Sequence, residues 1–274
     1  MLAASPALAE RPTSLGLHES ARILGMGGAF VAVADDPQAG LLNPAGLREI
    51  SQIGMDLSFS SATGTTPEQA AVMLVNPSSE AGAAFGAGLL EQGLFDGERV
   101  KYYVPNTGVS YQVWGLSRLG LGLRFPYRFS KVDSINSRWE TVGDLSMMQS
   151  FGNMKIGAQI ERMFGGASDI VPRRLRGGVS IGQPGQYVAA FEWRGTESGS
   201  RYNFHWESSH LGAEIAAKYV ALRSGYVWGQ ERRAVAVGLA FGLLQNGWRF
   251  EAGWEMPTVK HEETRWSVGF GIRD

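Results

Sequence analysis

The chain has 274 residues, a formal net charge of −1 and no cysteine. This charge gives no basic field for nucleic acid, and the lack of thiols excludes disulfide frameworks, thiolate metal sites and cysteine nucleophiles. Only four histidines are present, so a histidine-rich metal site is not expected, and no apolar run is long enough for a transmembrane helix. Membrane β-strands are not excluded, because they are short and apolar on one face only.

The first ten residues, MLAASPALAE, have the features of the end of an export signal. Ala7-Leu8-Ala9 fits the small-x-small cleavage pattern, and Glu10 would begin the mature chain. The basic region and most of the apolar region of a full signal are absent, so a disordered alanine-rich start is the alternative. We predict that residues 1–9 are a residual signal peptide.

Residues 10–50 are predicted to form a compact, turn-rich segment. Asp36-Pro37 reads as a helix N-cap followed by a proline at the first helical position, and Asn43-Pro44 repeats the device. Each pair can start one short helical turn. The glycines that can end these turns are Gly40 and Gly46.

The same segment has no core of its own. Residues 29–34, AFVAVA, are apolar enough to be buried, and the preceding glycines allow close backbone packing or positive φ. We therefore predict that the segment is a plug packed in the lumen of a barrel. The motif positions are Gly25, Gly27, Gly28, Asp35, Asp36, Asn43, Pro44, Ala45 and Gly46.

A nucleotide loop or a metal site is the competing interpretation of these residues. The pattern G-x-G-x-x-G fails, because Phe30 stands at the third glycine position, and no Gly-Lys-Ser/Thr follows. Asp35 and Asp36 could bind a metal, but capping already accounts for Asp36. We predict neither a cofactor nor a metal.

From residue 51 to residue 274 the sequence alternates with a period of two. In the stretch 247–256, GWRFEAGWEM, aromatic and apolar residues alternate with arginine, glutamate and glycine. Stretches 118–130 and 265–273 repeat the pattern. Because side chains alternate across a strand, each segment has one apolar face and one polar or glycine face.

The polar face distinguishes a soluble sandwich from an outer-membrane barrel. Three features favour the barrel: aromatic residues near segment ends, many glycines on the polar face, and segments of about the 9–11 residues that span a bilayer. Short turns such as 183–186 and 244–247 separate the segments. About fifteen candidate strands occur, and since such barrels usually have an even number, we predict an all-β, transmembrane antiparallel barrel of about fourteen strands.

The predicted inward face carries charges of both signs. Cross-strand ion-pair ladders are the structural explanation, and a polar path or an anion-attracting stripe is the functional one. Catalysis is not predicted: the sequence has no G-x-S-x-G, and His205 with Glu207 is a single pair in a charged lumen. The candidate lumen charges are Arg124, Arg128, Glu140, Asp144, Arg174, Arg176, Arg223, Arg249, Glu251 and Arg265.

The stretch LGMGGAFVAVADDPQAGLLNPAGL resembles the N-terminal signature of the FadL-like superfamily of outer-membrane proteins, and especially its PorV/PorQ branch. The stretch 210–226, HLGAEIAAKYVALRSGY, is similar to a PorV-type strand pair. The resemblance implies a hatch around Asn43-Pro44-Ala45 inside a fourteen-stranded barrel. Members often end on an aromatic residue, whereas this chain ends GFGIRD.

Three functions follow as hypotheses for a bacterial outer-membrane protein in contact with lipid. The first is a PorV-type role in protein export or surface attachment, with secretion-system or exported proteins as partners. The second is FadL-like passive transport of fatty acids or other small hydrophobic compounds. The third is a structural or polar-pore barrel. The inward faces are polar rather than apolar, which counts mildly against the second.

Overall fold

The computed structural model describes residues 20–61, 69–77, 81–95, 98–115, 117–125, 127–129, 138–139, 141–164, 173–183, 185–197, 203–230, 232–243, 247–259 and 263–274. The predicted signal peptide, residues 1–9, lies outside this part of the chain, and so do residues 10–19 of the predicted N-terminal segment 10–50. Among the described residues, no helix is both long and apolar enough to cross a membrane.

The described chain begins with three short helical elements and continues as strands. The helical elements are α1 (Ala21–Gly25), α2 (Ala39–Leu42) and the 3-10 helix η1 (Pro44–Glu49). The strands are β1 (Gly54–Ser61), β2 (Gln69–Pro77), β3 (Ala81–Phe95), β4 (Glu98–Trp114), β5 (Ser117–Arg124), β6 (Tyr127–Phe129), β7 (Arg138–Trp139), β8 (Val142–Phe151), β9 (Met154–Phe164), β10 (Arg174–Gln183), β11 (Tyr187–Glu197), β12 (Phe204–Ala216), β13 (Val220–Gly229), β14 (Arg233–Gly242), β15 (Gly247–Pro257) and β16 (Arg265–Arg273).

All strands belong to one antiparallel sheet, so the predicted all-β architecture is confirmed. Strands β8 to β16 pair in sequence order, and β16 pairs with β1, which continues to β2 and β3. Strand β3 also pairs with β4, and β4 pairs with β5, which pairs with β8. In the described residues the sheet has 16 strands. Two of them, β6 and β7, are short: β6 pairs with β4, and β7 pairs with β6.

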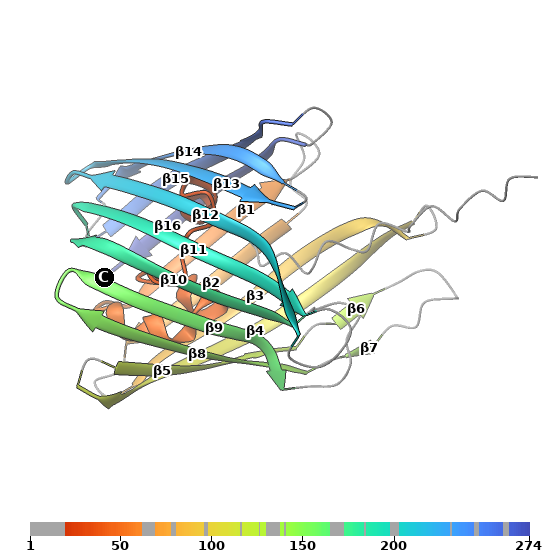
Figure 1. Cartoon of the computed structure of the whole chain (residues 1–274), viewed down its shortest axis with the longest axis horizontal. Helices are drawn as coiled ribbons and strands as arrows, with labels where there is room; N and C mark the ends of the chain where they lie inside the picture. The colour runs from red at the N-terminus through yellow and green to blue at the C-terminus, as the bar shows by residue number, and fades with distance from the viewer. Residues whose placement is uncertain are drawn as a thin grey trace, which may run out of the picture.

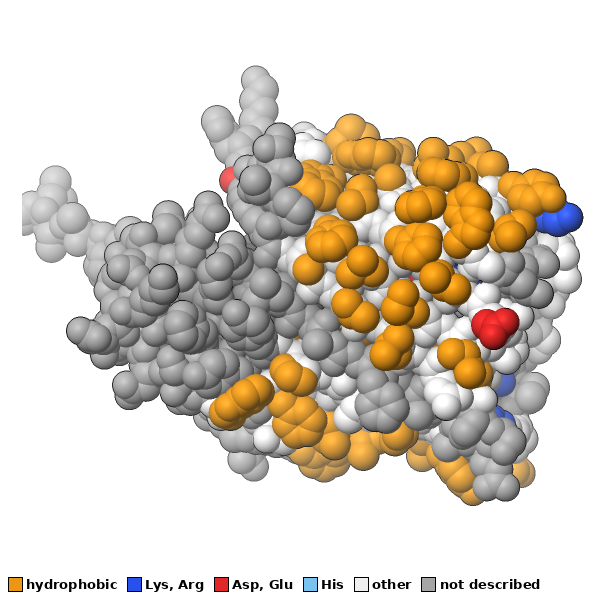
Figure 2. Space-filling view, turned by 180° about the vertical axis from the view of Figure 1, so that it is seen from behind, with side chains coloured by type: hydrophobic (Ala, Val, Ile, Leu, Met, Phe, Trp, Pro, Cys, Tyr) orange, Lys and Arg blue, Asp and Glu red, His pale blue; other side chains and the backbone are white. Residues whose placement is uncertain are grey.

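Large apolar side chains point outward along the sheet. On β14, Val235, Val237, Leu239 and Phe241 are 40–50% exposed, whereas the alternating Ala234, Ala236 and Ala240 are fully buried. Figure 2 shows apolar side chains spread over the outer face of the wall with few charges among them. The period of two in the sequence therefore separates an apolar outer face from a small or charged inner face.

The N-terminal segment, residues 20–50, lies inside the curve of the sheet (Figure 1). Its apolar residues form the main buried cluster of the described chain, together with inward side chains such as Met73, Met148 and Ala190. The prediction that residues 29–34 are buried is confirmed, since each is at most 2% exposed. The core of this protein is therefore the contact between the segment and the inner face of the sheet.

Candidate functional site

Two Asx caps shape the N-terminal segment. The Asn43 side chain accepts a hydrogen bond from the Ala45 N–H at 3.2 Å and caps η1, as predicted. The Asp36 carboxylate accepts the N–H of Gln38 at 2.9 Å, but α2 begins at Ala39. The prediction that Pro37 is the first helical position is therefore wrong, and the cap closes a turn that precedes the helix.

The predicted helix-ending role of the two later glycines is also wrong. Gly40 lies within α2 and Gly46 lies within η1. At Gly46 a Cβ atom would stand 2.1 Å from the carbonyl oxygen of Ala34, so glycine is required there for the close crossing of two chain stretches. At Gly46, therefore, glycine marks close packing rather than the end of a helix.

The first attachment is α1 with the glycine run that follows it: the helix packs on the inner face of β14 and β15, and the run continues across β13 and β12. Gly27 has φ 61°, and a Cβ there would stand 2.9 Å from the backbone nitrogen of Tyr226. Gly25 packs directly on Gly238, and the Gly27 carbonyl lies 2.5 Å from Nδ1 of His210. The glycine run thus brings two backbones into contact rather than forming a nucleotide loop.

A second attachment holds the predicted Asn-Pro-Ala motif, and we call its wall residues the Ala45 pad: Ser110 of β4, Gly120 of β5 and Ser146 of β8. The Ala45 N–H donates to Ser146 Oγ at 3.0 Å, and Ser110 Oγ donates to the Ala45 carbonyl at 2.9 Å. A Cβ on Gly120 would stand 2.0 Å from the Ala45 nitrogen. The pad therefore binds both main-chain polar groups of one residue, Ala45, and leaves no space beside it.

A third attachment is Glu192 of β11, which is fully buried. One carboxylate oxygen accepts the N–H groups of Phe30 and Val31, each at 2.8 Å, and the other accepts Arg194 Nε at 2.7 Å. Arg194 Nη2 in turn donates to the Gly28 carbonyl at 2.6 Å. A single wall carboxylate therefore holds the middle of the segment by its main chain.

The fourth attachment is ionic and is centred on Arg22 of α1; we call it the Arg22 latch. Nε and Nη2 of Arg22 donate to the two oxygens of Glu214, both at 2.9 Å, and Nη1 contacts Asp35 and reaches Asp36 at 3.0 Å. Burial opposes the charged forms, yet the attraction between Arg22 and Asp35 prevails, so the pKa of Asp35 is lowered and the pKa of Arg22 is raised. The acidic pair thus serves as the counter-charge of an arginine, and the described residues contain no group of three metal-ligating side chains.

The latch continues as a chain of buried ion pairs along the wall. Glu214 pairs with Arg223 at 2.6 Å, and Arg223 pairs with Glu251 at 2.9 Å. Arg249 joins Glu251 at 3.3 Å and Asp56 at 2.8 Å. These contacts connect β12, β13, β15 and β1, as a cross-strand ladder would.

Four of the remaining predicted lumen charges, Arg124, Asp144, Arg174 and Arg176, form further ion pairs. Arg124 pairs with Asp144 at 2.7 Å, and Arg176 pairs with Glu161 at 2.8 Å. Arg174 is half-buried and reaches Glu207 at 3.0 Å. Arg265 is half-buried on β16, Glu140 lies outside the described residues, and Arg128 lies on β6 with its side chain outside them. This pairing is the arrangement that the structural explanation of the charges requires.

The His205–Glu207 pair is not assembled as a catalytic unit. His205 is exposed, whereas Glu207 binds Arg174 and the hydroxyl of Thr196. No other nucleophile and base were predicted from the sequence.

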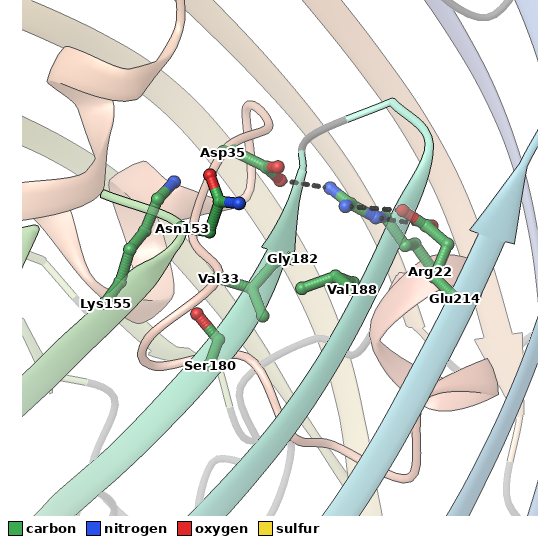
Figure 3. A pocket seen from close by; sticks show the side chains of 9 residues that line it. All are labelled: Arg22, Val33, Asp35, Asn153, Lys155, Ser180, Gly182, Val188 and Glu214. Atoms are coloured by element: carbon green, nitrogen blue, oxygen red, sulfur yellow. Dashed lines mark hydrogen bonds and ion pairs between the residues drawn. The ribbon is translucent and has the colours of Figure 1, made fainter. Parts of the chain in front are cut away.

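A small cavity lies beside the Arg22 latch (Figure 3). In Figure 3 the Arg22 guanidinium stands between Asp35 on one side and Glu214 on the other. The free space is on the order of one water molecule. The lining residues are Arg22, Val33, Asp35, Asn153, Lys155, Ser180, Gly182, Val188 and Glu214.

Sequence reasoning missed Arg22, the Ala45 pad and the role of Glu192. Arg22 could have been found, because it is the only charged residue in the apolar stretch 21–34. A lone charge in a buried stretch needs a partner. The pad residues carry no such signal, because small residues are frequent on every inward face.

Comparison with known proteins gives a match of fold. No protein-family model matches the chain, and no curated protein matches it. Among solved structures, it is similar to the "CymD monoaromatic hydrocarbon channel", with TM-score 0.72 and 12% identity over 93% of this chain and 97% of that one. It is also similar to the toluene transporter TbuX of Ralstonia pickettii, with TM-score 0.66 and 15% identity over 93% of this chain and 98% of that one. A Pseudomonas aeruginosa FadL homologue matches with TM-score 0.66 and 8% identity over 92% of this chain and 96% of that one.

These likenesses show a FadL-like fold over nearly the whole length of both chains. The three structures are described as channels, transporters or a FadL homologue, not as enzymes. The narrower resemblance to the PorV/PorQ branch gains no support from them.

Proposed function

We propose that the chain is a passive outer-membrane channel for small hydrophobic molecules, with a transmembrane barrel of fourteen strands closed between β3 and β4. Residues 20–50 are the plug of this barrel. The pairing of β3 with both β2 and β4 supports the closure, with β6 and β7 as an extension outside the ring.

The observation that carries the membrane assignment is the inverted polarity of the sheet. Exposed strand positions hold large apolar residues, while buried positions hold arginine and glutamate held in ion pairs. A water-soluble sandwich has the opposite arrangement, whereas a barrel in lipid needs this one. Aromatic side chains such as Trp248, Phe250 and Phe241 stack together on the outer face near one end, as an interfacial girdle does.

The connections give an orientation. At the end where the chain terminates, β8–β9, β10–β11, β12–β13 and β14–β15 are joined by the short stretches 152–153, 184–186, 217–219 and 243–246. At the opposite end most connections are longer, such as 62–68, 165–173 and 258–264. Bacterial barrels have short periplasmic turns and longer outer loops, so we assign the C-terminal end to the periplasm.

The cargo class rests on the similar structures, because the cavity beside Arg22 is too small for a hydrocarbon and most of its lining residues are charged or polar. Two of them are described as a monoaromatic hydrocarbon channel and a toluene transporter. This favours passive transport of hydrophobic compounds over the export role that the sequence first suggested. The polar inner face serves in this proposal to hold the plug, through the four attachments described above.

The test is uptake of a neutral apolar dye, N-phenylnaphthylamine, by cells with an intact lipopolysaccharide layer. Cells that produce the chain should take up the dye faster than cells that do not, while their exclusion of a large hydrophilic probe stays unchanged. Equal dye uptake would overturn the channel. Native mass spectrometry of the extracted protein adds a second readout: a retained small apolar molecule supports the channel, and a retained exported protein supports the export role instead.

A further inference from the structure

The cavity beside the Arg22 latch lies at the proposed periplasmic end of the barrel. Two of its lining residues, Asn153 and Gly182, belong to or adjoin the short turns β8–β9 and β10–β11. The two turns are bonded to each other, since the Gly182 N–H donates to the Asn153 carbonyl at 2.9 Å. The cavity is therefore placed between the plug and the periplasmic rim of the wall.

Most residues that line this cavity are charged or polar, and Val33 and Val188 add apolar surface. Arg22 and Asp35 come from the plug, and Lys155 and Glu214 come from β9 and β12 (Figure 3). Lys155 Nζ also bonds Glu49 of η1 at 2.8 Å. Such a lining suits water and small polar solutes rather than a hydrocarbon.

The plug is held differently at this point than elsewhere. At the Ala45 pad and at Glu192, main-chain groups of the plug are bonded directly to the wall. Next to these bonds, a Cβ at Gly120 or Gly157 would stand about 2 Å from the plug backbone, so no space is left. At the latch, charged side chains join plug and wall beside a void, and Ser180, which also lines the void, donates from Oγ to the Ala32 carbonyl at 2.8 Å. Movement of the Arg22 and Glu214 side chains alone would therefore enlarge the void, while the plug backbone stays bonded to the wall.

We propose that the Arg22 latch is a periplasmic gate. When Arg22 leaves Glu214, the cavity joins the periplasmic space and gives a polar, water-filled passage beside the plug, while the Ala45 pad stays bound. This inference rests on the proposed plugged barrel and extends it, because it adds a route for water, ions and small polar solutes along the axis of the barrel.

The experiment uses a cysteine reporter, since the chain has no cysteine of its own. Val33 lines the cavity, is 2% exposed and is close to cysteine in size, so Val33→Cys reports opening. A membrane-impermeant maleimide is applied to the full chain in detergent or proteoliposomes. Adding Arg22→Gln should raise the labelling rate by at least about tenfold, because removing one partner of a buried pair is strongly destabilising.

Arg124→Gln is the matched control. Arg124 is also buried and also paired with a carboxylate, Asp144, but both lie on the wall. Equal labelling rates in the Arg22→Gln and Arg124→Gln backgrounds would overturn the gate. If Arg22→Gln does not fold, Glu214→Gln removes the wall side of the same latch and must give the same rise.

Conductance, labelling and dye uptake together distinguish a failure of the proposed gate from a failure of the proposed hydrophobic channel. Ion conductance in planar bilayers with potassium chloride should increase in the Arg22→Gln chain and not in the Arg124→Gln chain. A rise in labelling and conductance without dye uptake by the native chain would support the gate and overturn the hydrophobic cargo. Dye uptake with no labelling difference would support the cargo and overturn the gate.

Discussion

The fully buried Glu192 gives the sharpest test of how the N-terminal segment, proposed above to be a plug, is held. Its carboxylate accepts two plug N–H groups, those of Phe30 and Val31, at 2.8 Å each. Replacement by alanine leaves both donors buried without this partner. Each unsatisfied buried donor costs about 1–3 kcal/mol, so docking of the plug should weaken by about 2–6 kcal/mol.

Limited trypsin digestion in detergent measures this change. Arg22 and Arg48 are the cleavage sites of the plug, and Arg22 is buried in the docked state. When opening is fast relative to cleavage, the cleavage rate follows the population of undocked plug. Because about 1.4 kcal/mol is a factor of ten, Glu192→Ala should speed cleavage by about one and a half to four powers of ten.

Glu161→Ala provides the control. Glu161 is also buried and pairs at 2.8 Å with Arg176, which lies 3.8 Å from Glu192 as well. Both changes remove a wall carboxylate near the same arginine, but only Glu192 is bonded to Phe30 and Val31. If the two variants are cleaved at the same rate, the reasoning that main-chain bonds to Glu192 hold the plug is refuted.

Three further changes test other parts of the structure. Gly120→Val should undock Ala45 and raise trypsin cleavage of the plug, whereas Gly177→Ala, with open space around its Cβ position, should leave cleavage unchanged. Asn43→Ala removes the cap of η1 and the hydrogen bond to the Val31 carbonyl, so docking should weaken by at least about 1 kcal/mol and the rate of trypsin cleavage should rise accordingly. An unchanged cleavage rate would contradict the capping role. Leu239→Arg, on the outer face of β14, should lower the unfolding free energy in lipid vesicles by about 2–4 kcal/mol in urea titrations; a change within about 0.5 kcal/mol would indicate a water-exposed surface instead.

Much of the fold could be predicted because the period of two is a strong local signal. The outward register of Val235, Val237 and Leu239 follows directly from alternation. The cap at Asn43 was also predictable, since it depends on residues two positions apart. Boundaries in the N-terminal segment were less predictable: Gly40 and Gly46 read as helix ends but lie within α2 and η1, and at Gly46 a neighbour in space, Ala34, determines the need for glycine.

The attachments of the plug could not be derived from sequence, because they join residues far apart in the chain. Nothing local distinguishes Glu192 from the other inward glutamates, and Ser110 with Ser146 looks like any small inward pair. Their roles depend on which wall residue faces which plug peptide. That arrangement depends on the register of every strand pair in the sheet. Alternation alone does not fix this register, because a strand shifted by two residues keeps the same side chains on the same face.

The long separation between bonded groups has a consequence for biogenesis. Arg22 and Glu214 are 192 positions apart, and Phe30 and Glu192 are 162 apart. The plug is made first, but its partners on β11 and β12 are made near the end of the chain. Contacts of such high sequence separation form late, after the cost of closing the long loop has been met. In the proposed outer-membrane barrel, Arg22 therefore stays without Glu214 during secretion and insertion, and a chain truncated before β11 would reach the membrane with its N-terminal segment undocked.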